Sequence, residues 1–349
     1  MSVRSRNHVK QKWCCSMQMN QLAQYISLQV PAAWEHCYSE AMEHYRADWL
    51  DELDFEYILD YYRFNEDYYK PRLRRELELL KRDESLNRAC WLMHYIMFYA
   101  QDKEDFLNTW GWKGTPKAFA EHGSPVTCVV AQLAGQPIHE KNMADRGYDD
   151  EQIDIHKNGV RGCWVGQHEV YGIDGVGFGH MLWGAYFMKC HLVRIGRLQY
   201  ESGLKHFGTY DHLFDKEPVY IYIHIPSADN GLQDDEVEQS VHMALERLER
   251  YYPEVKDKQV VFCTHTWLLS PELREILKPE SNIVKFQNRF HITEFDESVG
   301  PFLSFGFKVT PGPDVDYNAL PEDTHLRREI KKRLINGEKL HQGFGYFTV

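Results

Sequence analysis

Hydrophobic residues follow two different periods along the chain, and the change between them falls near Gly172. Before that point, apolar residues recur every three or four positions, which is the spacing of helices with one buried face. One such segment begins after Asp83, a favourable N-cap residue, and its apolar positions are Leu86, Cys90, Met93 and Met97. The pattern predicts roughly five to eight helices and no strand between residues 31 and 172.

Proline and glycine mark further helix boundaries in the same half of the chain. Ser124-Pro125 places a capping residue before a proline, and the apolar segment that follows stops at Gly135. The segment Pro137–Arg146 ends at Gly147 in the same way. These signals agree with an all-helical N-terminal half.

Strands with a period of two begin after Gly172. The clearest is Val219–Ile225, in which the β-branched residues face one way and Tyr220, Tyr222 and His224 face the other. Cys190–Glu201 and Gln259–Trp267 are expected to be strands as well. The second half of the chain is therefore expected to contain a sheet.

Helices and further strands complete this half of the chain. We expect an amphipathic helix at Asp234–Tyr252, a short helix after Ser270-Pro271 and a basic helix that begins at Thr324 and stops at Gly337. The expected strands are Asn282–Phe295, Phe302–Val309 after a turn near Gly300, and a last strand in the tail Gly343–Val349.

The order of these elements predicts the architecture. A strand, a helix and a second strand give a parallel pair, and the two later strands give an antiparallel hairpin at the end of a mixed sheet. We therefore expect an α+β protein with an N-terminal arm (1–34), an all-helical domain (35–172) and a domain with a mixed β-sheet flanked by helices (173–349). A chain of 349 residues is also long enough for two cores.

Charge and composition exclude several functions. The formal net charge is −12, which argues against nucleic acid as a partner because phosphate backbones need a basic surface. No apolar run is long enough to cross a membrane, and no apolar stretch follows the basic N-terminal residues as in a signal peptide. We expect a cytoplasmic protein. The eight cysteines form no CxxC pair, so we expect no structural zinc.

Several segments resemble a bacterial two-domain family that pairs a helical N-acyltransferase N-terminal domain with a GNAT-like C-terminal domain. The matching segments are IGRLQYE (195–201), VYIYIHIPS (219–227), THTWLLSPELREIL (264–277) and SNIVKFQNRF (281–290). The resemblance covers most of residues 35–335. It implies a protein that transfers an acyl group directly from acetyl-CoA or another acyl-CoA to a small-molecule amine acceptor, without a metal.

The resemblance also implies a place for the chemistry. In this fold two parallel strands splay apart, and here they are 219–225 and 259–267. By this analogy the coenzyme A arm lies along the first strand, and the implied contacts are Ile223, His224, Ile225, Ser227, Gly231 and Thr264. A general base takes the proton of the amine, and the candidates are His265, His224 and Glu201. We expect His265 to matter more than His224, because it stands at the mouth of the splay.

One departure from the family pattern leaves an alternative open. The loop after the first splayed strand has one glycine, Gly231, no lysine or arginine, and the acids Asp229, Asp234, Asp235 and Glu236. The N-terminus of a helix attracts a pyrophosphate through its positive end, and acidic side chains at that position compete for the same positive charge. Either coenzyme A has help from outside the loop, for which the basic helix 324–337 is a candidate, or the domain is a non-catalytic module that binds a ligand or partner.

A third class of function, a metal hydrolase, has little support. Histidines are frequent in this half of the chain, but no two have the spacing of a helical ligand pair such as HExxH. The histidines in question are His191, His206, His212, His224, His265 and His291.

Overall fold

The computed structural model describes residues 36–100, 126–169, 172–177, 181–202, 217–226 and 231–349. These residues form two compact units that divide between Cys190 and His191. The domain boundary near residue 172 stays a prediction of the sequence. The expected arm and the Ser124-Pro125 cap lie outside the described residues.

The first unit is helical, as predicted, and its described residues include no strand. Its α-helices are α3 (His36–His44), α4 (Phe55–Tyr61), α5 (Tyr69–Arg82), α6 (Glu84–Tyr95), α8 (Thr127–Leu133), α9 (Gln136–Asp145), α10 (Asp150–Glu169) and α11 (Met181–Met188). A 3₁₀ turn, η2 (Trp49–Glu52), and a π-helical turn, η3 (Ile96–Ala100), complete it. Trp164, Tyr62 and Tyr69 are its largest fully buried side chains.

Local capping sets the start of these helices. The Asp83 carboxylate accepts hydrogen bonds from the backbone N–H groups of Ser85 and Leu86, at 3.0 and 3.1 Å, and so begins α6 as predicted. Asn65 does the same before α5, because its side chain accepts from the N–H groups of Tyr68 and Tyr69. Each cap satisfies donors that the first helical turn would otherwise leave without a partner.

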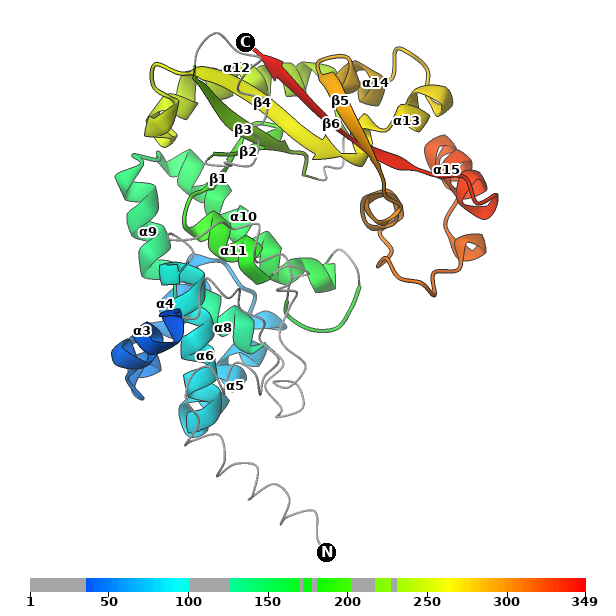
Figure 1. The fold of residues 1–349 in the computed structure, drawn as a ribbon. Coiled ribbons are helices and arrows are strands. Elements are labelled where there is room, and N and C mark those ends of the chain that lie inside the picture. The colour runs from blue at the N-terminus through cyan, green and yellow to red at the C-terminus, as the bar shows by residue number, and fades with distance from the viewer. Residues whose placement is uncertain (1–35, 101–125, 170–171, 178–180, 203–216, 227–230) are drawn as a thin grey trace, which may run out of the picture. The chain divides into compact units, whose positions relative to one another are not determined.

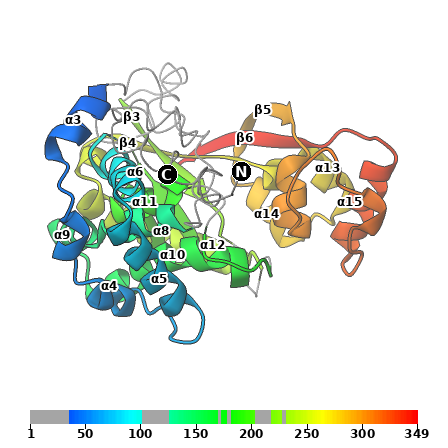
Figure 2. The same ribbon diagram turned by 90° about the horizontal axis from the view of Figure 1, so that it is seen from below.

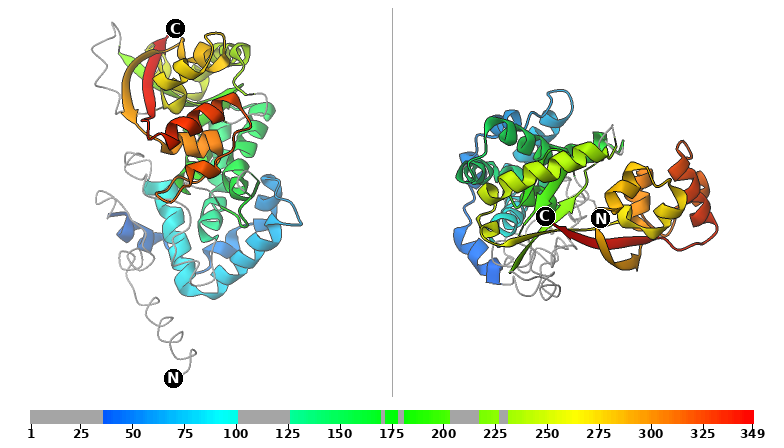
Figure 3. Two further views of the ribbon diagram at one scale, coloured as in Figure 1. Left: turned by 90° about the vertical axis from the view of Figure 1, so that its right-hand side faces the viewer. Right: turned by 90° about the horizontal axis from the view of Figure 1, so that it is seen from above.

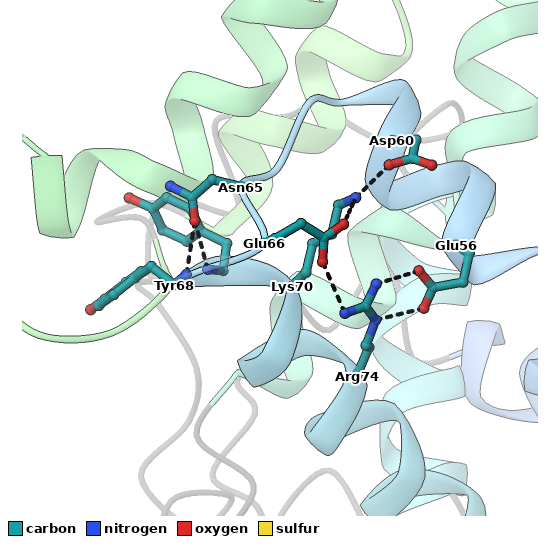
Figure 4. A network of polar contacts seen from close by, with 8 residues as sticks. Glu56, Asp60, Asn65, Glu66, Tyr68, Lys70 and Arg74 are labelled. Atoms are coloured by element: carbon teal, nitrogen blue, oxygen red, sulfur yellow. Dashed lines mark hydrogen bonds and ion pairs between the residues drawn. The ribbon is translucent and has the colours of Figure 1, made fainter.

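A network of charged residues joins α4 to α5 (Figure 4). The buried Lys70 donates to Asp60 on α4 and to Glu66, the latter at 2.6 Å. Arg74 makes a two-pronged bond to Glu56 and reaches Glu66 as well. The carboxylates are exposed, so the network fixes the packing of two helices rather than forming a pocket.

The second unit is built on a six-stranded mixed sheet with the strand order β1-β2-β3-β4-β6-β5. The strands are β1 (Leu192–Ile195), β2 (Leu198–Glu201), β3 (Pro218–His224), β4 (Gln259–Thr266), β5 (His291–Glu297) and β6 (His341–Thr348). Only β3 and β4 are parallel, and every other neighbouring pair is antiparallel. This confirms the predicted α+β class, the parallel pair and the last strand in the tail.

Helix α12 (Asp234–Tyr251) lies across one face of this sheet (Figure 3). Its residue Ser240 docks on the β1–β2 hairpin: its hydroxyl donates to the carbonyl of Ile195 at 2.5 Å and accepts from the N–H of Leu198 at 3.2 Å. The sequence pattern predicted this helix and the strands on either side of it.

The remaining helices of the second unit form a lobe beside β5 and β6 (Figure 2). They are α13 (Pro271–Ile276), α14 (Asn282–Gln287), a π-helical turn η8 (Phe302–Phe307), and α15 (His325–Ile335), which Thr324 caps as predicted. Short 3₁₀ turns are η6 (Pro253–Val255), η7 (Trp267–Leu269) and η9 (Tyr317–Ala319). The lobe has a small core of its own, made of Leu273, Phe302, Leu303, Phe307, Leu320, Ile330, Leu334 and Leu340.

Three strand predictions were wrong. The segment Asn282–Phe295 is α14 followed by β5, because Ser281 caps a helix at the start of the segment. The segment Phe302–Val309 is not a strand either. Phe302 and Phe307 pack into the core of the lobe from a π-helical turn, and β5 pairs with β6 instead of forming a hairpin with this segment.

The third error concerns Cys190–Glu201, which is a tight hairpin of β1 and β2 rather than one strand. Gly196 at its turn has φ +60°, a conformation that favours glycine. A Cβ atom there would lie 2.7 Å from the end of the Met243 side chain. The turn therefore requires glycine at position 196, and the spacing of hydrophobic residues does not predict such a turn.

Candidate functional site

The parallel strands β3 and β4 stop pairing before they end. Their regular register runs from Pro218 opposite Gln259 to Tyr222 opposite Cys263, whereas β3 continues to His224 and β4 to Thr266. Past the last pair, a side chain joins the strands: the Thr264 hydroxyl donates to the carbonyl of Ile223 at 2.8 Å. This is the place where the sequence analysis expected two strands to splay.

Alternation along the strands sends two sets of side chains to opposite faces of the sheet. On the α12 side, Tyr200 packs edge-on against Phe262 and its hydroxyl is hydrogen-bonded to Ser240. The opposite face holds a cluster of Tyr220, Val261, Cys263 and Phe344, with Tyr222 and Tyr346 packed against it. Because residues two apart share a face, His224 and His265 also belong to this second face.

His224 and Glu201 form a hydrogen-bonded pair on this face. The Nε2 atom of His224 lies 2.5 Å from Oε2 of Glu201, which comes from the neighbouring strand β2. Only 3% of Glu201 is exposed, whereas the imidazole is partly open to solvent. A buried carboxylate holds an imidazole in one orientation, and it stabilises the imidazolium that forms when the ring takes a proton.

His265 pairs with a different carboxylate. Its Nε2 atom is hydrogen-bonded to Asp296 on β5, and the Gln342 side chain donates to the same carboxylate at 2.9 Å. Here both members are exposed, 37% for the histidine side chain and 51% for the aspartate. Solvent screens such a pair and lets its side chains move, so it orients the imidazole less firmly.

Between the two histidines stands Tyr222. Its ring centroid lies 4.7 Å from that of His224, and its hydroxyl is hydrogen-bonded to the backbone of His265. Burial raises the pKa of this phenol above its ordinary value. Burial, followed by the charge of Glu201, likewise raises the pKa of the Cys263 thiol, which makes that cysteine a poor nucleophile.

Basic residues gather around the start of α12, although the loop before it has none in the sequence. Arg289 bonds to Asp234 at 2.6 Å, and Lys285 lies 3.6 Å from the same carboxylate. The hydrogen bond from Arg289 holds the pKa of Asp234 below its usual value. Asp234, one of the four acids, is therefore already neutralised by cations from α14 and the turn after it.

A third cation, Arg197, supports the same loop from the β1–β2 turn. It is 8% exposed, and it donates to the carbonyls of Pro226 and Gly231 at 2.7 and 3.0 Å. Burial lowers the pKa of this guanidinium. These three cations were not predicted from the sequence, because they come to the start of α12 from distant segments.

Three cations of the basic helix α15 are paired within their own lobe. Arg327 pairs with Asp323, Lys331 with Glu322, and Arg333 with Glu275. The first two also donate to backbone carbonyls nearby. These contacts give that helix a structural role in the lobe.

Of the implied coenzyme A contacts, Ser227 lies outside the described residues. Ile223 and Thr264 meet at the splay, and Gly231 has φ +73° and receives Arg197. Ile225 follows β3 directly. The roles of all of these residues stay predictions.

A group of possible metal ligands occurs in the first unit. The ligand atoms of His139, His156 and Cys190 lie within 4.8 Å of one another and are buried. The two nitrogens of His139 are hydrogen-bonded to Tyr62 and His156, at 2.8 and 2.9 Å, and burial holds the pKa of His139 well below its ordinary value. These bonds satisfy His139 as a neutral ring. The expectation of no structural zinc stays a prediction.

Comparison with known proteins finds a matching domain family and solved structures with a similar fold. Residues 192–347 match the family model of the GNAT-like C-terminal domain. An acyltransferase solved in complex with decanoyl-CoA and teicoplanin superposes with a TM-score of 0.70 at 19% identity, covering 95% of this chain and 99% of that chain. The same values hold for an acyltransferase with CoA and 10C-teicoplanin.

An acyltransferase in complex with decanoyl-CoA gives a TM-score of 0.70 at 18% identity, and the match covers 95% of this chain and 100% of that chain. No curated protein matches the chain. Among the described residues, no helix has the length and apolar character needed to cross a membrane. Residues 192–347 thus match the model of a GNAT-like C-terminal domain, and the chain shares the fold of these acyltransferases.

Proposed function

We propose that the protein is an acyl-CoA-dependent N-acyltransferase that moves an acyl group from coenzyme A to the amine of a small molecule. The observation that carries the proposal is the His224–Glu201 pair, which stands at the end of β3 where the parallel ladder stops. The similar acyltransferase structures were solved with decanoyl-CoA or CoA, and two of them with teicoplanin or its 10C form, which supports an acyl-CoA donor and a small-molecule acceptor.

The reaction needs one proton acceptor. The amine nitrogen attacks the thioester carbonyl carbon, a C–N bond forms, the C–S bond breaks, and coenzyme A leaves as a thiolate that takes up the proton released by the amine. We propose that the imidazole of His224 accepts the amine proton, because the Glu201 carboxylate is hydrogen-bonded to its Nε2 atom and holds the ring. Glu201 holds the ring and offsets the positive charge that it gains.

We favour His224 over His265 as the base. The sequence analysis ranked His265 first by its position on β4, but its carboxylate partner is exposed, whereas the partner of His224 is buried. A general base must keep one orientation of its ring, and a buried carboxylate such as Glu201 holds that orientation more firmly than an exposed one.

Coenzyme A carries a pyrophosphate, which needs positive charge at its binding site. We propose that Arg197, Lys285 and Arg289 supply this charge at the start of α12, in place of the basic loop that the sequence lacks. Two of these cations pair with Asp234, and this offset of one acidic charge supports the proposal. We also propose a cytoplasmic location, where acyl-CoA is available.

Calorimetry with CoA, acetyl-CoA, octanoyl-CoA and decanoyl-CoA tests this function directly. We expect saturable binding of CoA and of at least one acyl-CoA, and release of free thiol when an amine acceptor is added. Binding of acyl-CoA without any transfer to a panel of amines would favour the non-catalytic module. If no CoA species binds, the acyltransferase assignment is wrong.

A further inference from the structure

Where β3 and β4 separate, the Tyr222 hydroxyl makes hydrogen bonds to β4 that the backbone of a paired strand would otherwise make. The Tyr222 hydroxyl accepts a hydrogen bond from the backbone N–H of His265 at 2.8 Å and donates one to the carbonyl of the same residue at 2.9 Å. In a regular parallel sheet, such a pair of groups bonds to the backbone of the adjacent strand. The phenol therefore satisfies the edge of β4 that the splay would leave unpaired.

The Thr264 hydroxyl on β4 joins the two strands at the same point, because it donates a hydrogen bond to the carbonyl of Ile223 on β3. Thr264 is buried and 1% exposed. Together the two side chains extend the ladder by one step beyond the pair of Tyr222 and Cys263. They define an apex, the point past which the backbones of β3 and β4 are no longer joined by the described contacts.

The apex lies next to the proposed base. The ring of Tyr222 packs against the imidazole of His224, with an angle of 44° between their planes. Because burial keeps the phenol protonated, its hydroxyl stays able to donate to the carbonyl of His265. A group that enters the splay as far as the apex therefore stops beside His224.

We propose that Tyr222 is a positioning residue, whose hydroxyl sets how far an acyl thioester enters the splay and thereby selects acyl-CoA over CoA. This inference rests on the proposed function, since it assumes that acyl-CoA binds between β3 and β4. Without the hydroxyl, the N–H and carbonyl of His265 lose their partner, and β4 must shift or admit water to satisfy them. The stop for the thioester is then lost, while the distant contacts with the pyrophosphate remain.

The variant Tyr222→Phe removes this hydroxyl and keeps the ring against His224. We expect its Kd for octanoyl-CoA or decanoyl-CoA to rise about tenfold, the effect of losing one buried hydrogen-bonded group. Its Kd for CoA should stay within about twofold of the parent value. General destabilisation would change both affinities in parallel, so the ratio of the two is the informative quantity.

The matched control is Tyr220→Phe, which removes a hydroxyl from the same face of β3 where the ladder is still regular. Its two affinities should equal those of the parent. Hydrogen exchange gives a readout that needs no ligand: the amide of His265 should exchange at least about tenfold faster in Tyr222→Phe than in the parent.

An unchanged ratio of acyl-CoA to CoA affinity in Tyr222→Phe, or an unchanged exchange rate at His265, overturns the inference. If the parent binds neither CoA nor acyl-CoA, the proposed function fails and the role for the thioester fails with it. The exchange measurement then still decides whether the hydroxyl holds the end of β4.

Discussion

The two histidine–carboxylate pairs on one face of the sheet differ mainly in the burial of the acid. Glu201, next to His224, is buried on β2, which has a strand on either side, whereas Asp296, next to His265, is half exposed on the edge strand β5. The hydrogen bond itself is present in both pairs. The pairs differ because water does not compete for the hydrogen bond of a buried carboxylate. The buried acid therefore keeps its histidine in place.

Replacing the two histidines gives the largest expected effect. His224→Gln should lower kcat for acyl transfer by about 10²–10⁴, the usual cost of a lost general base. His265→Gln should lower kcat by less than about tenfold, because its ring is held loosely by a solvated acid. Steady-state kinetics with a fixed acyl-CoA measures both. The reverse order would show that position along the strand outweighs burial of the partner.

Replacing the carboxylates sharpens the comparison. Glu201→Gln keeps the shape of the side chain but removes its charge, and kcat should fall by about 10- to 100-fold with a small change in KM. The matched change Asp296→Asn should alter kcat by no more than about twofold. Equal losses in the two variants would contradict the view that burial of the acid makes the difference.

A smaller effect is expected at the start of α12, where the charge for coenzyme A is proposed. Arg289→Gln should weaken acyl-CoA binding by about tenfold, because it removes a cation and leaves Asp234 less neutralised. Arg333→Gln is the control, since it makes the same charge change in the lobe, where Arg333 pairs with Glu275. Calorimetry at low and high salt should show the difference shrinking as salt screens the charges. Equal affinities in both variants would rule out this anion site.

A third histidine–carboxylate pair provides the smallest expected change in activity. Glu272 at the start of α13 accepts from the Ser270 hydroxyl at 2.5 Å and lies 2.6 Å from the ring of His341 on β6. Burial alone would raise the pKa of this carboxyl, but these two hydrogen bonds hold it below its ordinary value. The pair ties the lobe to the sheet and lies outside the splay.

The sign of its pH dependence follows from that shift. A carboxyl with a lower pKa in the folded state stabilises the protein at pH values above its unfolded pKa, and this stabilisation disappears as the pH falls through the folded pKa. Glu272→Gln should therefore reduce the free energy of unfolding at pH 7 by about 1 kcal/mol and leave kcat unchanged. Below about pH 4 the variant and the parent should converge. Denaturant titrations at several pH values test this, and a loss of turnover at full stability would contradict a purely structural role.

The amino-acid sequence by itself determined the elements whose signals are local. Alternation defined β3, the cap at Asp83 defined α6, and Thr324 with Gly337 defined α15. It also predicted the parallel strands between which the candidate site lies, because a strand, helix and strand in succession have few other ways to pack. Local signals failed at Asn282–Phe295, because its apolar residues fit a helix and a strand equally well. The cap at Ser281 and packing against the lobe core favour the helix at the start of this segment.

Only the tertiary structure decided the electrostatics of the site. Glu201 and His224 are 23 positions apart in the chain, and nothing in their neighbours shows that one will be buried and bonded to the other. Arg197 likewise reaches the carbonyl of Gly231, and Arg289 reaches Asp234 at the start of α12, each from a separate segment of the chain. Charge and burial depend on distance in three dimensions, whereas period and capping depend on distance along the chain.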